Sequence, residues 1–201
     1  MTLSLIAFAA LAQKGGHTMD ANGMKAGHTT PSDLAAGANK WVGKAAPAFA
    51  LRDTKGNATS LKGFRGKPTV LVFIEKNCPC CKGGRPYFDR VQRRYGDVAH
   101  VVGVVVASPK EVRDWKVKNG AEFTVLSDAK GDGPRAFGTT SSLFTVLIDK
   151  EGTIVRAYPG YSAPMLQELT ASIATLAKIK DRKMDTRPAP AEFTSGCPFK
   201  G

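Results

Sequence analysis

The chain has 201 residues, of which 42% are hydrophobic and 23% are charged with mixed signs, so it can build one ordinary core and wholesale disorder is excluded. The net charge of +12 favours anionic partners, yet the basic residues are scattered and accompany no nucleic-acid motif, so we expect no nucleic-acid partner. Three of the four cysteines fall within four residues, which argues against a disulfide framework and indicates redox or metal chemistry.

The N-terminal segment predicts export. Residues 1–12 form an apolar run that ends on Ala10-Leu11-Ala12, a small-x-small pattern typical of a cleaved secretory signal, although the first cation is Lys14. The alternative is an apolar tail on a cytosolic protein; we favour a periplasmic or extracellular location. This run is too short to cross a membrane and no later run is long enough, so we expect no integral membrane span. Residues 13–40 are rich in small and polar residues and predict a flexible leader.

A single α/β domain is predicted over residues 41–180. A short hairpin is expected at 47–57, followed by strands at 68–74, 98–107, 123–126, 144–149 and 153–158. Helices are expected at 85–95, after Ser108, at 132–137 and at 163–180; Ser108 and Glu111 have the spacing of a capping box. This order predicts a mixed central sheet flanked by helices. Residues 181–201 are predicted to be an extended tail.

The cluster Cys78-Pro79-Cys80-Cys81 lies where the strand at 68–74 passes into a helix. A sulfur at a helix start faces unpaired N–H groups and the positive end of the helix dipole, which favour the reactive thiolate. The spacing of Cys78 and Cys81 brings two sulfurs within disulfide range. We therefore expect Cys78 to be the more exposed thiol that attacks first, and Cys81 to resolve the mixed disulfide from one turn deeper.

The other cysteines leave alternatives open. Cys80 is interpreted as an accessory thiol or a surface residue, because a vicinal disulfide with Cys81 is strained. Cys197 could reach back as a resolving thiol, pair between molecules or stay idle. Three thiolates could instead hold zinc or Cu(I), which is the competing hypothesis of a metal-binding protein. The leader also carries His17, Met19, Met24 and His28, a composition that suits copper but that more often has no role.

With these residues placed, the stretch from about residue 42 to 176 resembles the redoxin group, which comprises AhpC/TSA-type peroxiredoxins and TlpA-like thiol–disulfide oxidoreductases. The resemblance rests on residues 42–53, 60–67 and 70–73, and on Val146-Leu-Ile-Asp-Lys-Glu-Gly152. It implies a thioredoxin-like fold with an N-terminal hairpin extension. It also implies an enzyme that needs no cofactor. Its expected partner is a protein that serves as dithiol or disulfide substrate, or a reductant.

Two departures from the family patterns bear on the activity. TlpA-like members carry Trp before the first cysteine and a cis-proline opposite the site; this chain has Asn77 and Leu143 at those positions. Peroxiredoxins place Pro and Thr seven and three residues before the attacking cysteine, where alignment on Cys81 finds Ile74 and Cys78. We therefore predict a thiol–disulfide oxidoreductase cycling Cys78 and Cys81, and rank it above a peroxiredoxin-like peroxidase using Cys81.

Overall fold

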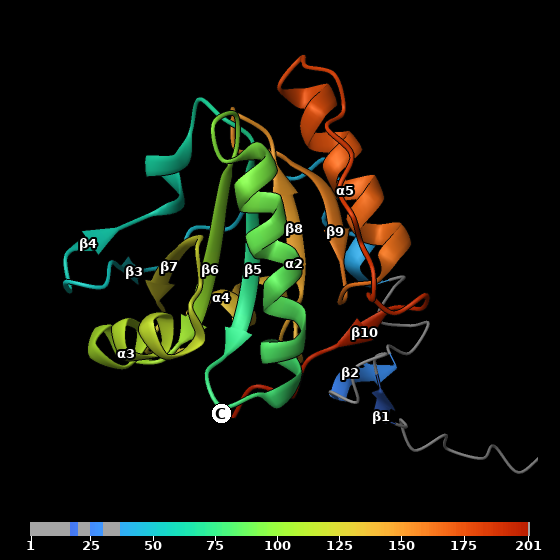
Figure 1. Cartoon of the computed structure of the whole chain (residues 1–201). Helices are drawn as coiled ribbons and strands as arrows, with labels where there is room; N and C mark the ends of the chain where they lie inside the picture. The colour runs from blue at the N-terminus through green and yellow to red at the C-terminus, as the bar shows by residue number, and fades with distance from the viewer. Residues whose placement is uncertain (1–16, 20–24, 30–36, 201) are drawn as a thin grey trace, which may run out of the picture.

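The computed structural model describes residues 17–19, 25–29 and 37–200. Its centre is a seven-stranded sheet with strand order β4-β3-β7-β6-β5-β8-β9 (Figure 1). Strands β5 (Thr69–Glu75), β6 (His100–Val106) and β7 (Thr124–Ser127) are parallel to one another. On the other side of β5, β8 (Thr145–Ile148) pairs antiparallel with it and β9 (Ile154–Tyr158) pairs antiparallel with β8. The predicted hairpin is β3 (Leu51–Arg52) with β4 (Ala58–Thr59). The mixed α/β sheet is confirmed.

Helices cover both faces of this sheet. On one face α2 (Pro79–Tyr95), α3 (Pro109–Asn119) and α5 (Ala163–Leu176) form the larger core, and Figure 1 shows α2 lying across the front of the sheet. On the other face, α4 (Asp132–Phe137) packs with residues 38–49 and with the 3₁₀ helix η1 (Leu61–Phe64). Strand β5 contributes side chains to both cores, because its successive side chains alternate between the two faces of the sheet and all seven residues are buried.

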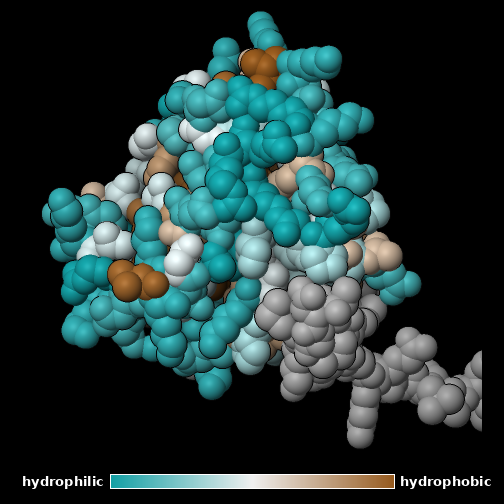
Figure 2. All heavy atoms as spheres, in the orientation of Figure 1, coloured by the Kyte–Doolittle hydropathy of each residue, from teal (hydrophilic) through white to brown (hydrophobic). Residues whose placement is uncertain are grey.

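Local sequence signals predicted most of these helices and strands. The predicted capping box is confirmed, since Ser108 and Glu111 satisfy each other's backbone N–H groups at the start of α3. Two helix boundaries differ from the expectation: α2 begins at Pro79 rather than at residue 85, because Cys78 itself caps it, and α5 ends at Leu176. Among the described residues, none of the helices has the length and apolarity needed to cross a membrane. The face drawn in Figure 2 is mostly hydrophilic, with scattered apolar side chains.

The two ends of the described chain meet in a second, three-stranded sheet. Strand β2 (Lys25–Thr29) lies between β1 (His17–Met19) and β10 (Thr194–Ser195), with His28 opposite Ser195 in the register. Two strands thus fall within the predicted flexible leader, and the predicted C-terminal tail folds back onto the domain (Figure 1). The pairing of β2 with β10 joins segments far apart in the sequence, whereas β1 pairs with the nearby β2. Residues 1–12 lie outside the described residues, so the signal segment and export stay predictions.

Candidate functional site

The cysteine cluster lies at the carboxyl end of β5, where the chain turns into α2. Cys78 is the N-cap of the helix, and its sulfur accepts a hydrogen bond from the backbone N–H of Cys81 at 3.2 Å. Pro79 occupies the first turn, where a missing N–H costs nothing. The sulfur of Cys78 therefore takes the place of the side-chain oxygen that normally caps a helix, and it lies at the positive end of the helix dipole.

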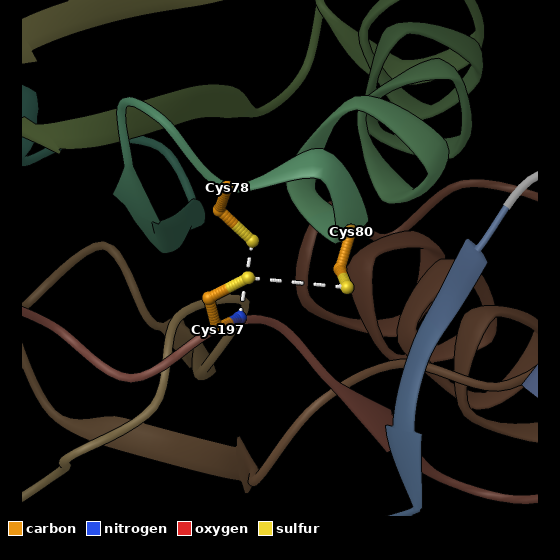
Figure 3. A group of neighbouring side chains, drawn as sticks. All are labelled: Cys78, Cys80 and Cys197. Carbon is orange, nitrogen blue, oxygen red and sulfur yellow. Dashed lines mark hydrogen bonds between the residues drawn. The ribbon is translucent and has the colours of Figure 1, made fainter. Parts of the chain in front are cut away.

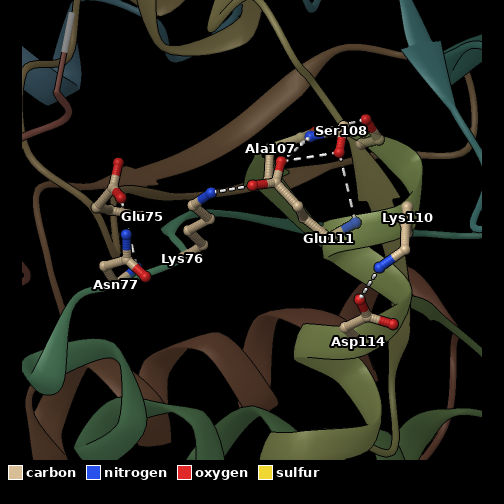
Figure 4. Close-up of polar contacts among 9 residues, drawn as sticks. Glu75, Lys76, Asn77, Ala107, Ser108, Lys110, Glu111 and Asp114 are labelled. Atoms are coloured by element: carbon tan, nitrogen blue, oxygen red, sulfur yellow. Dashed lines mark hydrogen bonds and ion pairs between the residues drawn. The ribbon is translucent and has the colours of Figure 1, made fainter.

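The turn that leads into Cys78 is tied to a neighbouring helix. Lys76 forms an ion pair with Glu111 in the first turn of α3, and Ser108 donates to the same carboxylate (Figure 4). The ammonium of Lys76, followed by the donors of Ser108, lowers the pKa of Glu111 to about 2. The amide of Asn77 donates to the buried side chain of Glu75 at 3.4 Å. The approach to the cysteines is thus fixed by polar contacts on both sides of the turn.

Ser142, in the loop before β8, connects the two cysteines of the C-x-x-C pair. The thiol of Cys81 donates to the hydroxyl oxygen of Ser142 at 3.2 Å, and the same oxygen lies 3.6 Å from the sulfur of Cys78. Ser142 is fully buried. One hydroxyl therefore contacts both sulfurs of the predicted redox pair, a role that nothing in the local sequence signalled.

The next residue, Leu143, stands where the TlpA-like pattern has a cis-proline. Its φ is +65°, in the left-handed region that leucine rarely adopts, and its amide donates to the carbonyl of Phe73 at 2.7 Å. The buried side chain packs on Gly84 of α2, where an added Cβ would lie 3.0 Å from it. The loop that carries Ser142 is therefore held against the cysteine helix by packing and by a strand-to-loop hydrogen bond.

The C-terminal segment covers the cluster. The amide of Ser142 donates to the carbonyl of Cys197 at 3.0 Å, and the amide of Gly196 donates to the carbonyl of Ser142 at 2.8 Å. The amide of Cys197 then donates to the sulfur of Cys78 at 3.0 Å (Figure 3). The approach is so close that a Cβ added to Gly196 would lie 2.1 Å from the hydroxyl of Ser142. Residues 196–197 thus pair with Ser142 as an added β-strand would.

This cover corrects two expectations about the cysteines. Cys78 is only 1% exposed, as are Cys80 and Cys81, so the prediction that Cys78 is the more exposed thiol of the pair is wrong. The interpretation of Cys80 as a surface residue is wrong for the same reason. Its sulfur lies 4.0 Å from that of the half-buried Cys197 (Figure 3). All four cysteines are free thiols in this structure.

The four thiols differ sharply in acidity. The pKa of Cys78 is lowered far below its ordinary value, first by the donating thiol of Cys80, then by the thiol of Cys81 and by Cys197. The pKa of Cys80 is raised by that same hydrogen bond and by burial. Burial, followed by contact with Cys78, raises the pKa of Cys81 and of Cys197. These shifts favour ionisation of Cys78 over ionisation of the other three thiols.

The sulfurs also form a compact set that sequence spacing did not reveal. Those of Cys78, Cys80 and Cys197 all lie within 4.8 Å of one another, whereas Cys81 is turned toward Ser142. The contribution of Cys197 depends on the returning tail, so no spacing signal could have identified it. Ser142 likewise belongs to no recognisable motif. The nearest sequence signal is the adjacent Leu143, which occupies the position of the cis-proline in the TlpA-like pattern.

Comparison with known proteins decides the family. The sequence profile of the AhpC/TSA family matches residues 42–158, more than half of the chain. The chain belongs to the AhpC/TSA family. Two curated relatives are similar to it at 30% identity: peroxiredoxin Q of the chloroplast of Oryza sativa subsp. japonica over 131 residues, and the thiol-disulfide oxidoreductase ResA of Bacillus thuringiensis subsp. konkukian over 125 residues.

These matches cover part of each relative rather than the whole protein. The chain spans 60% of the rice peroxiredoxin Q and 70% of the ResA protein, using 61% and 59% of its own length. A solved Chlorobium tepidum protein, assigned as a thiol:disulfide interchange protein DsbE, superposes with a TM-score of 0.61 at 28% identity, covering 68% of this chain and 97% of that one. The thioredoxin-like fold is thereby confirmed.

Proposed function

We propose that this AhpC/TSA-family protein is a thiol–disulfide oxidoreductase that cycles Cys78 and Cys81 between dithiol and disulfide. The observation that carries the proposal is geometric: the Cys78 sulfur caps α2, the Cys81 thiol lies one turn deeper, and both contact Ser142. Such a pair separates the attacking group from the resolving group. The similarity to ResA and to the DsbE-assigned structure supports the same activity.

In the reducing direction, the thiolate of Cys78 attacks one sulfur of a substrate disulfide. A Cys78–substrate disulfide forms and the second substrate sulfur leaves as a thiolate, which takes up a proton. Cys81 then loses its proton and attacks the sulfur of Cys78, so the first substrate sulfur also leaves as a thiolate. The substrate gains two electrons and the enzyme is left with a Cys78–Cys81 disulfide. The reverse sequence oxidises a substrate dithiol.

The electrostatics of the pair support an order in which Cys81 reacts second. While Cys78 is a thiolate, its charge and its hydrogen bond add to burial in keeping the pKa of Cys81 high. Forming the mixed disulfide removes that charge, so Cys81 becomes easier to ionise. The hydroxyl of Ser142 accepts the Cys81 thiol hydrogen bond beforehand and keeps its sulfur close to that of Cys78.

Substrate access requires the C-terminal segment to move, because Cys78 is 1% exposed beneath it. Once Gly196 and Cys197 leave, the amide and carbonyl of Ser142 are free to pair with an extended polypeptide. A disulfide carried on such a polypeptide would then reach Cys78. We therefore propose a protein disulfide or dithiol as the substrate class.

Insulin reduction coupled to mass mapping tests the proposal. We expect wild type to reduce insulin, Cys78→Ser to be inactive, and Cys81→Ser to accumulate a mixed disulfide at Cys78. Oxidised wild type should show a Cys78–Cys81 crosslink. A crosslink that never includes Cys78, or full activity in Cys78→Ser, contradicts the proposal.

Hydroperoxide consumption is the competing activity, since relatives include peroxiredoxin Q. The sequence assigned that activity to Cys81, whose pKa is raised by burial, whereas the pKa of Cys78 is lowered. Peroxide turnover that disappears in Cys81→Ser but survives in Cys78→Ser would replace our proposal with the peroxidase.

A further inference from the structure

The structure assigns a second capacity to the cluster: we propose that the reduced protein binds one Cu(I) ion through the sulfurs of Cys78, Cys80 and Cys197. This goes beyond disulfide exchange, because it uses Cys80 and Cys197, which that reaction does not need, and leaves out Cys81. The three sulfurs lie within 4.8 Å of one another (Figure 3). They come from two segments more than a hundred residues apart, the start of α2 and the C-terminal tail.

The donor set suits a soft monovalent ion. Thiolates select Cu(I) and zinc over harder cations. Zinc in structural sites is coordinated by four ligands in a tetrahedron. Cu(I) is stably coordinated by three thiolates in a plane. Within the described part of the chain this cluster offers three sulfurs, and the fourth cysteine, Cys81, is engaged with Ser142. The geometry therefore favours Cu(I) over zinc.

Coordination requires only small rearrangement and a defined loss of protons. Because thiolates and not thiols bind the metal, coordination would release the thiol protons of Cys78, Cys80 and Cys197, with no change of oxidation state. The N–H groups of Cys81 and Cys197 donate to the sulfur of Cys78 and offset the negative charge of the site. Cys78 and Cys80 are 1% exposed, which would keep water and oxygen from the ion.

The returning tail is what completes the set. The carbonyl of Cys197 and the amide of Gly196 are both fixed to Ser142, so the sulfur of Cys197 is held near Cys78 by the backbone and not by chance contact. Its neighbour, β10, is anchored in turn by pairing with β2. A thiol held in this way loses little conformational entropy when it binds an ion.

An anaerobic titration with Cu(I), using bathocuproine disulfonate as the competing chelator, tests the assignment. Reduced wild type is expected to take up one ion per chain against the chelator, and X-ray absorption to show three sulfur neighbours. Cys80→Ser and Cys197→Ser should each weaken binding by more than the roughly 10- to 100-fold that loss of an outer-shell partner costs. Circular dichroism confirms that each variant is folded.

Cys81→Ser is the matched control, because it changes a buried thiol of the same cluster that lies outside the proposed set. It should bind Cu(I) as wild type does while losing the dithiol cycle, so the failure of one proposal is distinguishable from that of the other. Binding that is lost in Cys81→Ser and kept in Cys197→Ser would overturn the assignment in favour of the C-x-x-C pair. So would the absence of uptake against the chelator, or four sulfur neighbours around zinc in place of copper.

Discussion

The backbone amide of Cys197 donates a hydrogen bond of 3.0 Å to the sulfur of Cys78, across 119 residues of chain. Because the donor belongs to the backbone, this contact depends on where the tail lies and not on which side chain residue 197 carries. It links access to ionisation: the segment that shields Cys78 from solvent also stabilises its thiolate. Displacing the tail should therefore make Cys78 more accessible and slightly less acidic at once.

Replacing Gly196 with alanine should displace the tail without removing a thiol. The new Cβ would lie 2.1 Å from the hydroxyl of Ser142 and 3.2 Å from the sulfur of Cys81, both of which are buried. We expect a bulky maleimide to label Cys78 faster in Gly196→Ala than in wild type, measured by mass mapping of quenched samples.

Gly63→Ala is the matched control for this experiment, because a Cβ there meets open space and the site is far from the cysteines in the fold. It should label at the wild-type rate. Equal labelling rates in Gly196→Ala and wild type, with both folded, would show that the tail does not limit access to Cys78.

The pH dependence of alkylation should separate Cys78 from an ordinary thiol. A lowered pKa means that Cys78 is already a thiolate at neutral pH, so its rate with iodoacetamide should stay nearly constant as pH rises from about 6 to 8.5. Cys81, whose pKa is raised by burial, should stay unlabelled over the same range. Urea-unfolded protein gives the reference, with a roughly tenfold rise per pH unit below about 8.5. A native Cys78 profile with that same rise contradicts the assignment.

Removing the hydroxyl of Ser142 should slow the resolving step while lowering the stability of the fold only modestly. In Ser142→Ala the Cys81 thiol loses its acceptor and the carbonyl of Cys197 loses a 2.8 Å hydrogen bond from the hydroxyl, but that carbonyl keeps its bond from the Ser142 amide. We expect a loss of about 1 kcal/mol in unfolding free energy and slower decay of the mixed disulfide at Cys78. Stopped-flow thiol exchange measures the decay, and the neighbouring, half-buried Ser141→Ala should match wild type. Unchanged decay in Ser142→Ala would remove this residue from the reaction.

Restoring the proline of the TlpA-like pattern at position 143 should destabilise this protein. Proline fixes φ near −65° and has no N–H, whereas Leu143 has φ of +65° and donates to Phe73. Leu143→Ala, which keeps the N–H, should cost about 2–5 kcal/mol for the lost buried side chain. Leu143→Pro should cost more than that in urea unfolding. A proline variant as stable as the alanine variant would show that the loop can adopt the family's usual conformation.

The order of strands and helices followed from the sequence, because its signals are local. The buried runs of β5 and β6, the capping pair Ser108 and Glu111, and the turn into Cys78 each lie within a few residues, where periodicity and capping chemistry act. The same local chemistry placed the sulfurs of Cys78 and Cys81 at a helix start. These features were predictable without knowing how distant segments meet.

Tertiary structure alone decided which thiols lie together and how they are covered. Ser142 reaches Cys81 across 61 residues and Cys197 reaches Cys78 across 119, and neither contact leaves a periodic trace in the sequence. The predicted exposure of Cys78 was wrong because the C-terminal tail, which is rich in proline and charge, carries no sequence signal that it packs back onto the domain. Backbone pairing with Ser142 and β2 supplies that reason, since hydrogen bonds between main chains depend on position and hardly on side-chain type.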